Sequence, residues 1–510
     1  MTNQDNTRRI AKNTIFMFMR MVLVVFVGFF TSRVILNTLG IEDYGIYNIV
    51  GSVVIFLSFF KNALNNATYR YLTYDLGKGN REKLKQTFAM ALNAHVILAL
   101  IMLILLEFFG TYFLNNKLNI PTERLYAANW AFQFSLLTFI VEIIRTPFNS
   151  TIISHEHLNF YAYTSIIEVF LKLAVVYLLM LGNFDKLILY AFMLFIVALI
   201  MLAWYILYCY KNYTETHYKR YWDTKILQSF TSYSGWSLIV NATDVTVQQC
   251  INFFFNIFGG VTINAAIGIA NQVNNHLNHF LSSFTTSFNP QIIKSYAKND
   301  LGYFMNLILS TSKISYFLLF SIAFPILLNI NFLLKIWLVN PPQHTAIFLL
   351  FIVIHSLIDA ISAPLWNAVH ATGKLKTHQL LMSTIKIINI PVAYLLLHFE
   401  YPFYYAIASY AFLNGSCCII RAIYMQHLIN LSLKKYIIGV IMKCIIVSLL
   451  SSILPIIYFS YHSNGWEELF VSTALFYIPY FSLVYIIGLN QKEKEKVLFL
   501  LLSKIKKRSI

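Results

Sequence analysis

The chain has 510 residues, of which 58% are hydrophobic and only 12% are charged, whereas a typical soluble domain carries roughly 25% charged residues. Its formal net charge is +17, from 38 Lys and Arg against 21 Asp and Glu. Because the apolar residues form long blocks separated by short basic gaps, this composition excludes most soluble proteins and leaves no basic domain large enough to bind nucleic acid. It predicts an all-α polytopic membrane protein.

Fourteen apolar segments are long enough to cross a bilayer core, which needs about 20 residues per helix. Each segment is expected to be helical, because a helix satisfies the hydrogen bonds of its own backbone within the lipid. In chain order the predicted spans are residues 14–36, 45–67, 86–109, 125–147, 162–182, 187–210, 229–257, 262–288, 305–330, 346–369, 378–397, 404–425, 437–460 and 469–489.

Basic residues gather in one alternate set of the gaps between these spans. An even number of spans places both termini on the same side of the membrane, and the positive-inside rule makes that side the cytoplasm. The opposite gaps hold little beyond Lys117, Lys186 and Lys335. The gaps assigned to the cytoplasm hold Arg8, Arg9, Lys12, Arg70, Lys78, Arg81, Lys83, Lys85, Lys211, Lys219, Arg220, Lys225, Lys294, Lys298, Lys374, Lys376, Lys434 and Lys435, followed by a Lys-rich tail.

A weak internal repeat appears when the chain is shifted by about 220 residues, because Gly40 then falls on Gly260 and both follow a long span through a tight turn. This order predicts two pseudo-symmetric six-helix lobes, residues 1–225 and 226–430. Two additional transmembrane helices would follow in residues 431–489, and a basic cytoplasmic amphipathic tail in residues 490–510. Repeated halves around a central cavity are typical of secondary transporters, in which one half rocks against the other.

The turn after the first span reads LGIEDYGIY, residues 39–47, with Arg33 near the end of the span. It resembles the LG-x-E-x-YG turn of Wzx-type polysaccharide flippases, the O-antigen and capsule exporters of the multidrug/oligosaccharidyl-lipid/polysaccharide (MOP) superfamily. The similarity extends to length, span count and two-lobe arrangement. The resemblance implies flipping of a polyprenyl-pyrophosphate-linked oligosaccharide to the periplasmic leaflet of a bacterial inner membrane, for surface polysaccharide or lipopolysaccharide biosynthesis. It implies membrane lipids, a polysaccharide polymerase and other assembly proteins as partners, and neither a cofactor nor a catalytic or metal site.

Ionisable side chains inside a span cost at least about 2.5–3.5 kcal/mol each, so they need a reason. An excess of cations suits a cavity that receives a diphosphate, which Arg contacts in a bidentate manner and Lys as a point charge. Arg20 and Lys61 are the strongest candidates, because they lie at similar depth and have no obvious acidic neighbour. The predicted pyrophosphate-binding residues are Arg20, Lys61, Arg145, Lys172, Lys313 and Lys386.

Embedded carboxylates are fewer, and a protonatable group at mid-depth suits ion coupling or gating. The candidates for that role are Asp244, Asp359, Glu142 and Glu168. A structural alternative stays open for each of them. Glu142 with Arg145 and Glu168 with Lys172 have the spacing of self-neutralising helical pairs, and the two aspartates are alternatively partners of Lys313 or Lys386.

Two rival functions remain. A membrane-embedded polymerase or glycosyltransferase would need a substantial external loop with catalytic groups, and no gap exceeds about 20 residues. A multidrug or cation antiporter of the related efflux branch would need a net acidic, aromatic cavity, whereas embedded cations outnumber acids here. No phosphate-binding GxxxxGK[ST] motif occurs, and the His155-Glu156-His157 segment is interpreted as a polar turn rather than a metal site.

Overall fold

In the computed structural model, short polar side chains cap the starts of several helices. The Asn80 side chain accepts a hydrogen bond from the Lys83 amide (3.0 Å) at the start of α3, and Asp300 accepts one from the Tyr303 amide (3.1 Å) at the start of α9. Gly79 follows α2 at φ +73°, a left-handed conformation that glycine adopts without strain. The structure describes residues 57–495 except 117–119, 180–183, 339–340 and 462–464, together with scattered positions from 13 to 51.

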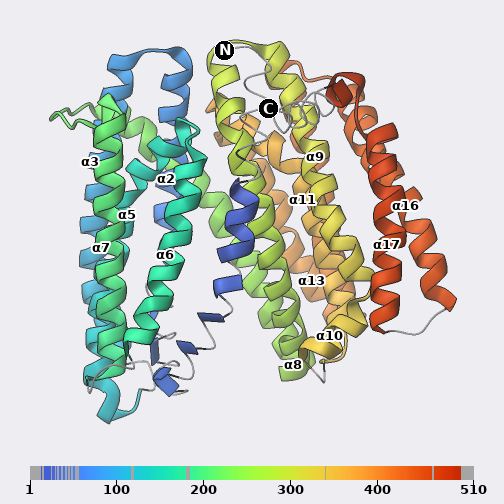
Figure 1. Cartoon of the computed structure of the whole chain (residues 1–510), viewed down its shortest axis with the longest axis horizontal. Coiled ribbons are helices and arrows are strands. Elements are labelled where there is room, and N and C mark those ends of the chain that lie inside the picture. The colour runs from blue at the N-terminus through green and yellow to red at the C-terminus, as the bar shows by residue number, and fades with distance from the viewer. Residues whose placement is uncertain are drawn as a thin grey trace, which may run out of the picture. The chain divides into compact units, whose positions relative to one another are not determined.

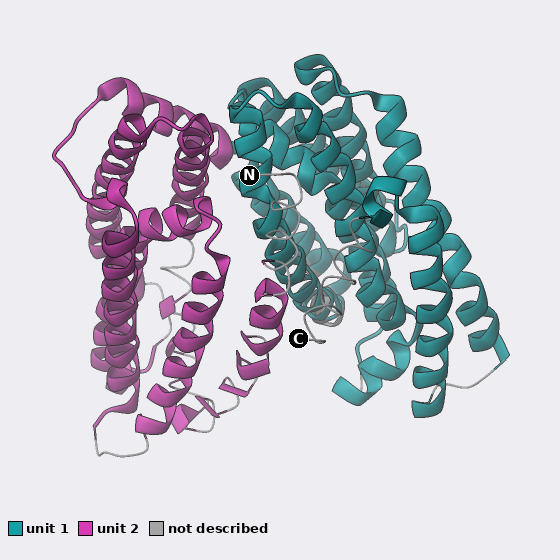
Figure 2. Ribbon diagram, turned by 45° about the horizontal axis from the view of Figure 1, so that its top comes forward, with its two compact units in different colours: residues 1–12, 239–510 teal, residues 13–238 magenta. Residues whose placement is uncertain are grey.

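The chain divides into two units, coloured separately in Figure 2. We call residues 13–238 the N unit and residues 239–510 the C unit. The N unit contains α2 (Ser58–Lys78), α3 (Arg81–Leu105), a π-helical turn (Leu106–Gly110), α4 (Thr111–Asn116), α5 (Leu125–Ser154), α6 (Leu158–Leu178), α7 (Lys186–Asn212) and two short 3-10 turns (Thr122–Arg124 and Thr214–Thr216).

The C unit contains most of α8 (Thr224–Ala297), which crosses the boundary between the units. Its other helices are α9 (Leu301–Leu328), α10 (Ile330–Leu338), α11 (Thr345–Thr372), α12 (Lys376–Ile387), α13 (Asn389–His398), α14 (Tyr404–Ile429), α15 (Leu433–Tyr436), α16 (Met442–Tyr461) and α17 (Trp466–Leu483), with π-helical turns at Ile437–Ile441 and Val484–Gly488.

Ten helical segments of the described chain are long and apolar enough to cross a membrane, and each overlaps one predicted span. The all-α polytopic fold class is therefore confirmed. Most described positions of span 14–36 are helical, including residues 16–24 and 26–28, and parts of spans 14–36 and 45–67 fall outside the described residues. Helix α2 continues past the predicted end of its span to Lys78, because the polar run after it stays helical until Gly79.

Helix α8 accounts for two predicted spans, 229–257 and 262–288. It has 74 residues, and a straight helix of that length would extend about 110 Å, more than three times the thickness of a bilayer core. Gln248 and Asn271 would lie about 35 Å apart on such a rod, yet both line one small cavity. The helix therefore folds back on itself between them. It is not among the ten described segments that are apolar enough to cross a membrane, so its two spans stay a prediction.

In the N unit, α5 packs against α7, α3 and α2, and Figure 1 shows these helices running along one another. Two apolar clusters form the core, one around Phe88, Phe148 and Met201 and the other around Phe132 and Leu136. In the C unit, α11 packs against α14 and α9, and α16 packs against α17.

Arg124 forms ion pairs with two aspartates at one end of the N unit. Arg124, directly before α5, contacts Asp43 through Nε (2.8 Å) and Nη2 (2.6 Å), and contacts Asp185 through Nη1 (2.6 Å). Asp185 also caps α7 by accepting from the Leu187 amide. Asp43 is one of the two acidic residues of the LGIEDYGIY segment, and through Arg124 it ties that segment to the starts of α5 and α7.

Candidate functional site

One face of α5 is polar although the helix lies in an apolar unit. Ser135, Thr138, Phe139, Glu142 and Arg145 are separated by three, one, three and three residues, which places them on one side of a helix. All five line a cavity of about 420 Å³, which we call the N-unit cavity. Its volume lies within the about 300–1,000 Å³ common for ligand sites.

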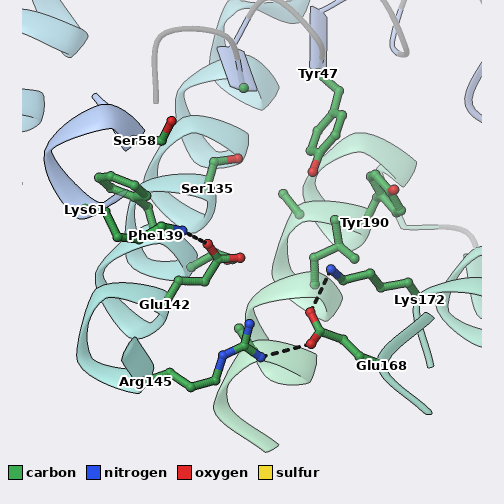
Figure 3. A pocket seen from close by; sticks show the side chains of 15 residues that line it. Tyr47, Ser58, Lys61, Ser135, Phe139, Glu142, Arg145, Glu168, Lys172 and Tyr190 are labelled. Atoms are coloured by element: carbon green, nitrogen blue, oxygen red, sulfur yellow. Dashed lines mark hydrogen bonds and ion pairs between the residues drawn. The ribbon is translucent and has the colours of Figure 1, made fainter. Parts of the chain in front are cut away.

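Charged side chains from three helices meet in this cavity (Figure 3). Lys61 of α2 donates from Nζ to Glu142 Oε2 of α5 at 2.7 Å. Glu168 of α6 accepts from Arg145 Nη1 of α5 at 3.0 Å and pairs with Lys172 Nζ, one turn further along α6, at 2.9 Å. Figure 3 shows Glu168 between its two cationic partners.

Three cations and two carboxylates line the N-unit cavity, which leaves one surplus positive charge. Both carboxylates bridge neighbouring helices, so the network also orients α2, α5 and α6 relative to one another. Isolated charges in such a place would be costly, and their pairing makes the site tolerable without a ligand.

A smaller polar cavity of about 130 Å³ shares Lys61, Glu142 and Arg145 with the larger one. Its remaining lining is three asparagines and a threonine: Asn62, Asn65, Asn149 and Thr146. The charged centre is therefore continued by uncharged hydrogen-bonding groups along α2 and α5.

The C unit has a separate cavity of about 240 Å³, which we call the C-unit cavity. Lys386 of α12 donates to Asp244 Oδ1 of α8 at 2.5 Å. Asp359 of α11 accepts from Asn414 Nδ2 at 2.9 Å and lies 3.5 Å from His355 Nδ1. The remaining polar lining is mainly amide side chains of α8.

Two predicted cations line neither cavity. Arg20 donates from Nη2 to the Tyr161 hydroxyl (3.3 Å), and its guanidinium lies 4.7 Å from the centre of that ring. Lys313 is 1% exposed and donates to Glu493 Oε2 at 2.7 Å. Among the predicted cations, Lys61, Arg145 and Lys172 meet in the N-unit cavity and Lys386 lies in the C-unit cavity.

The expectation that Lys61 lacks an acidic neighbour is wrong, since Glu142 contacts it across 81 residues of sequence. Long-range pairing also replaces the expected pair of Glu142 with Arg145, because Arg145 contacts Glu168 instead. The pair of Glu168 with Lys172 is confirmed, and so is the pairing of Asp244 with Lys386. Only packing of separate helices brings the distant partners together.

The His155-Glu156-His157 segment forms the turn between α5 and α6. His155 Nε2 lies 2.5 Å from Glu215 Oε1, and His157 Nδ1 is hydrogen-bonded to the Tyr213 hydroxyl at 2.7 Å. Burial works to raise the pKa of Glu215, but its contact with His155 outweighs that effect and holds the pKa below its ordinary value. In this structure, both histidines contact residues that follow α7, which fastens the turn.

Sequence reasoning missed the aromatic and amide lining. Tyr47 and Tyr190, whose rings pack edge-to-face with centroids 4.9 Å apart, both line the N-unit cavity. The amide side chains of the C-unit cavity could have been predicted from the sequence, because Asn271, Asn274 and Asn278 recur at helical spacing within predicted span 262–288.

Comparison with known proteins agrees with this architecture. Residues 17–178 match the MatE family model. A 129-residue stretch is 24% identical to a protein of Bacillus subtilis (strain 168) described as "Uncharacterized membrane protein EpsK"; the match spans 25% of each chain.

Solved structures share the fold at low sequence identity. A MATE protein in complex with MaD3S superposes with a TM-score of 0.71 at 12% identity, covering 83% of this chain and 96% of that one. A MOP superfamily transporter of Pyrococcus furiosus, whose structure was reported to have a binding pocket of reverse polarity, gives a TM-score of 0.70 at 12% identity over 84% of this chain and 98% of that one. Residues 17–178 thus match a MatE segment, and the chain shares its fold with these solved structures.

Proposed function

We propose that this multi-pass membrane protein, with its MatE segment on a MATE-type fold, translocates a polyprenyl-diphosphate-linked oligosaccharide from the cytoplasmic to the periplasmic leaflet. The two units would alternate between access to one side and to the other, as repeated transporter halves do. The single observation that carries this proposal is the N-unit cavity with its three cations against two carboxylates.

The chemistry of that cavity favours an anionic headgroup as ligand. A diphosphate diester bears two negative charges and presents the oxygen geometry that Arg145 and two lysines bind through charge-assisted hydrogen bonds. When such a ligand enters, Lys61 and Lys172 exchange carboxylate contacts for diphosphate contacts. The polyprenyl chain stays in lipid, because the charged groups that line the cavity suit the diphosphate and not a hydrocarbon tail.

In the N-unit cavity, charge also argues against the rival transport function. A cavity for a cationic drug needs surplus negative charge, whereas the surplus in the N-unit cavity is positive. The Pyrococcus furiosus transporter with the reverse-polarity pocket has the same fold, so this fold accommodates cavities of different charge. A polymerase would in turn need a catalytic loop, and the longest predicted gap is about 20 residues.

The decisive experiment deletes the gene in its natural host and follows lipid-linked oligosaccharides in each membrane leaflet. We expect full-length, unpolymerised units to accumulate on the cytoplasmic leaflet. Normal transfer to the outer leaflet with unpolymerised surface units would instead identify a polymerase and contradict the proposal.

Complementation then tests the cavity itself. Arg145→Gln and Lys172→Gln should each reduce export strongly at an unchanged protein level, because each removes the surplus positive charge. Lys225→Gln, at an exposed lysine at the start of α8 that lines neither described cavity, is the matched control and should export normally.

A further inference from the structure

The C-unit cavity differs in chemistry from the N-unit cavity. Six of its fifteen lining residues carry side-chain amides, all on α8: Gln248, Asn252, Asn271, Asn274, Asn275 and Asn278. The first two come from the arm of α8 before its reversal and the other four from the arm after it. The four asparagines after the reversal have the i, i+3, i+4, i+7 spacing of one helix face.

Most of these amides have no protein partner. Asn274 Oδ1 accepts from the Ser356 hydroxyl at 2.5 Å. Within the described part of the chain, the other five side chains make no hydrogen bond to the protein. An amide without a partner is costly in an apolar environment, and the four asparagines after the reversal lie near the middle of predicted span 262–288. A ligand can reach three of the six amides, which belong to the exposed residues Gln248, Asn275 and Asn278. A face of this kind is built for a polar ligand that replaces the missing bonds.

A neutral ligand that both donates and accepts hydrogen bonds fits this lining. Each amide offers two N–H donors and a carbonyl acceptor, which match the paired donor and acceptor character of sugar hydroxyls. An anion is disfavoured because Asp244 and Asp359 outnumber Lys386 among the charged lining groups, with His355 as the remaining titratable neighbour beside Tyr410. A metal cation is disfavoured because the Lys386 ammonium already occupies Asp244 at 2.5 Å.

An aromatic side chain completes the lining. Tyr410 of α14 lines the cavity, with one face of its ring stacked on His355 at a centroid distance of 4.5 Å and an interplanar angle of 12°. This stacking fixes the ring in place, and a fixed ring provides an apolar surface beside the polar amides. Carbohydrate rings combine an apolar face with a polar rim in the same way.

We propose that the C-unit cavity is a carbohydrate site, in which the α8 amides bind the hydroxyls of the glycan portion of the cargo. The choice of carbohydrate as the ligand rests on the proposed function, but the site is distinct from the diphosphate site. The N-unit cavity offers charge, and the C-unit cavity offers mainly neutral hydrogen-bonding groups. At about 240 Å³ the cavity suits a small part of a glycan rather than a long chain.

The test uses the full-length chain in lipid nanodiscs and saturation-transfer NMR with three neutral probes: maltotriose, chitotriose and mannotriose. At least one trisaccharide should show saturable binding to the wild type. Asn275→Ala and Asn278→Ala should each weaken that binding by roughly fivefold, as expected for one lost hydrogen bond. Asn271→Ala should do the same, whereas its matched control Gln272→Ala, at an exposed neighbour that does not line the cavity, should bind like the wild type.

Three outcomes would overturn the inference: no probe binds, the asparagine variants bind as well as the wild type, or sodium ion binds saturably in an Asn271-dependent manner while the sugars do not. Binding of inorganic pyrophosphate to the same samples separates the two proposals. Pyrophosphate binding without sugar binding would contradict the carbohydrate site alone. Sugar binding without pyrophosphate binding would contradict the proposed anionic cargo and support the carbohydrate site.

Discussion

Each charged side chain of the N-unit cavity forms an ion pair with an oppositely charged neighbour. Lys61 and Glu142 keep 21% and 32% of their side-chain surface exposed, so water or a ligand reaches the pair. Glu168 serves both Arg145 and Lys172. This arrangement makes the carboxylates competitors of an anionic ligand, because both seek the same cations.

This competition gives opposite expectations for the two members of one pair. Lys61→Gln should weaken pyrophosphate binding by roughly tenfold or more, because it removes a charged hydrogen-bond donor. Glu142→Gln should strengthen binding, because it frees Lys61 from its partner at 2.7 Å. Isothermal titration of pyrophosphate into the protein in nanodiscs measures both.

The double variant Lys61→Gln/Glu142→Gln distinguishes a specific contact from net charge. It keeps the surplus charge of the cavity but lacks the lysine, so we expect it to bind as weakly as Lys61→Gln alone. Wild-type affinity in the double variant, or weaker binding by Glu142→Gln, would show that Lys61 does not contact the ligand.

At the scale of helices, a polar segment after the last span is fastened to α9. Glu493 accepts from Lys313 Nζ at 2.7 Å, from the Ser310 hydroxyl at 2.5 Å and from the Asn490 amide at 2.7 Å. Lys313 was predicted from sequence to bind pyrophosphate. Because it is 1% exposed and already paired, we now propose that it anchors the segment after α17.

The anchor has a defined pH dependence. Burial works to raise the pKa of Glu493, but the Asn490 amide, Lys313 and Ser310 outweigh it, so its pKa lies below the ordinary value. A depressed carboxyl pKa stabilises the fold above the unfolded-state pKa of about 4.3, and this stabilisation is lost as the pH falls through the folded-state pKa. The Tm of the purified protein should therefore fall on acidification below about pH 4.3.

Glu493→Gln should lower the Tm at pH 7 and flatten that acid dependence, because it leaves Lys313 buried without its carboxylate; removing one partner of a buried pair costs about 3–5 kcal/mol. Thermal unfolding followed by intrinsic fluorescence across pH 3–7 is the measurement. The apolar pair Lys313→Met/Glu493→Leu should recover much of the lost Tm while staying insensitive to acid. An acid dependence that survives in Glu493→Gln would assign it to another group.

For the whole molecule, the distribution of basic residues among the gaps predicts the orientation in the membrane. Both termini are expected in the cytoplasm. Reporter fusions after residues 225, 435 and 495 should show cytoplasmic green fluorescence and no alkaline phosphatase activity. A fusion after residue 340, in a gap assigned to the opposite side, should show the reverse pattern, and phosphatase activity at residue 225 would contradict the assigned orientation.

The sequence by itself determined the fold class and most of the spans, because the long apolar blocks leave the helix as the structure that satisfies their backbone in lipid. It also identified Lys61, Arg145, Lys172 and Glu168 as costly embedded charges, three of them cations of one cavity. Local spacing was sufficient for the Glu168–Lys172 pair, since partners four residues apart lie on one face of the same helix.

Only the tertiary structure decided which distant charges meet. Glu142 lies 81 residues from Lys61 along the chain, and Glu493 lies 180 residues from Lys313. Likewise, the amides of α8 became one surface only when the two arms of that helix folded against each other to line a single cavity. The periodicity of a helix fixes which residues share a face, but the packing of faces between helices depends on the shape of the whole unit, which no local pattern encodes.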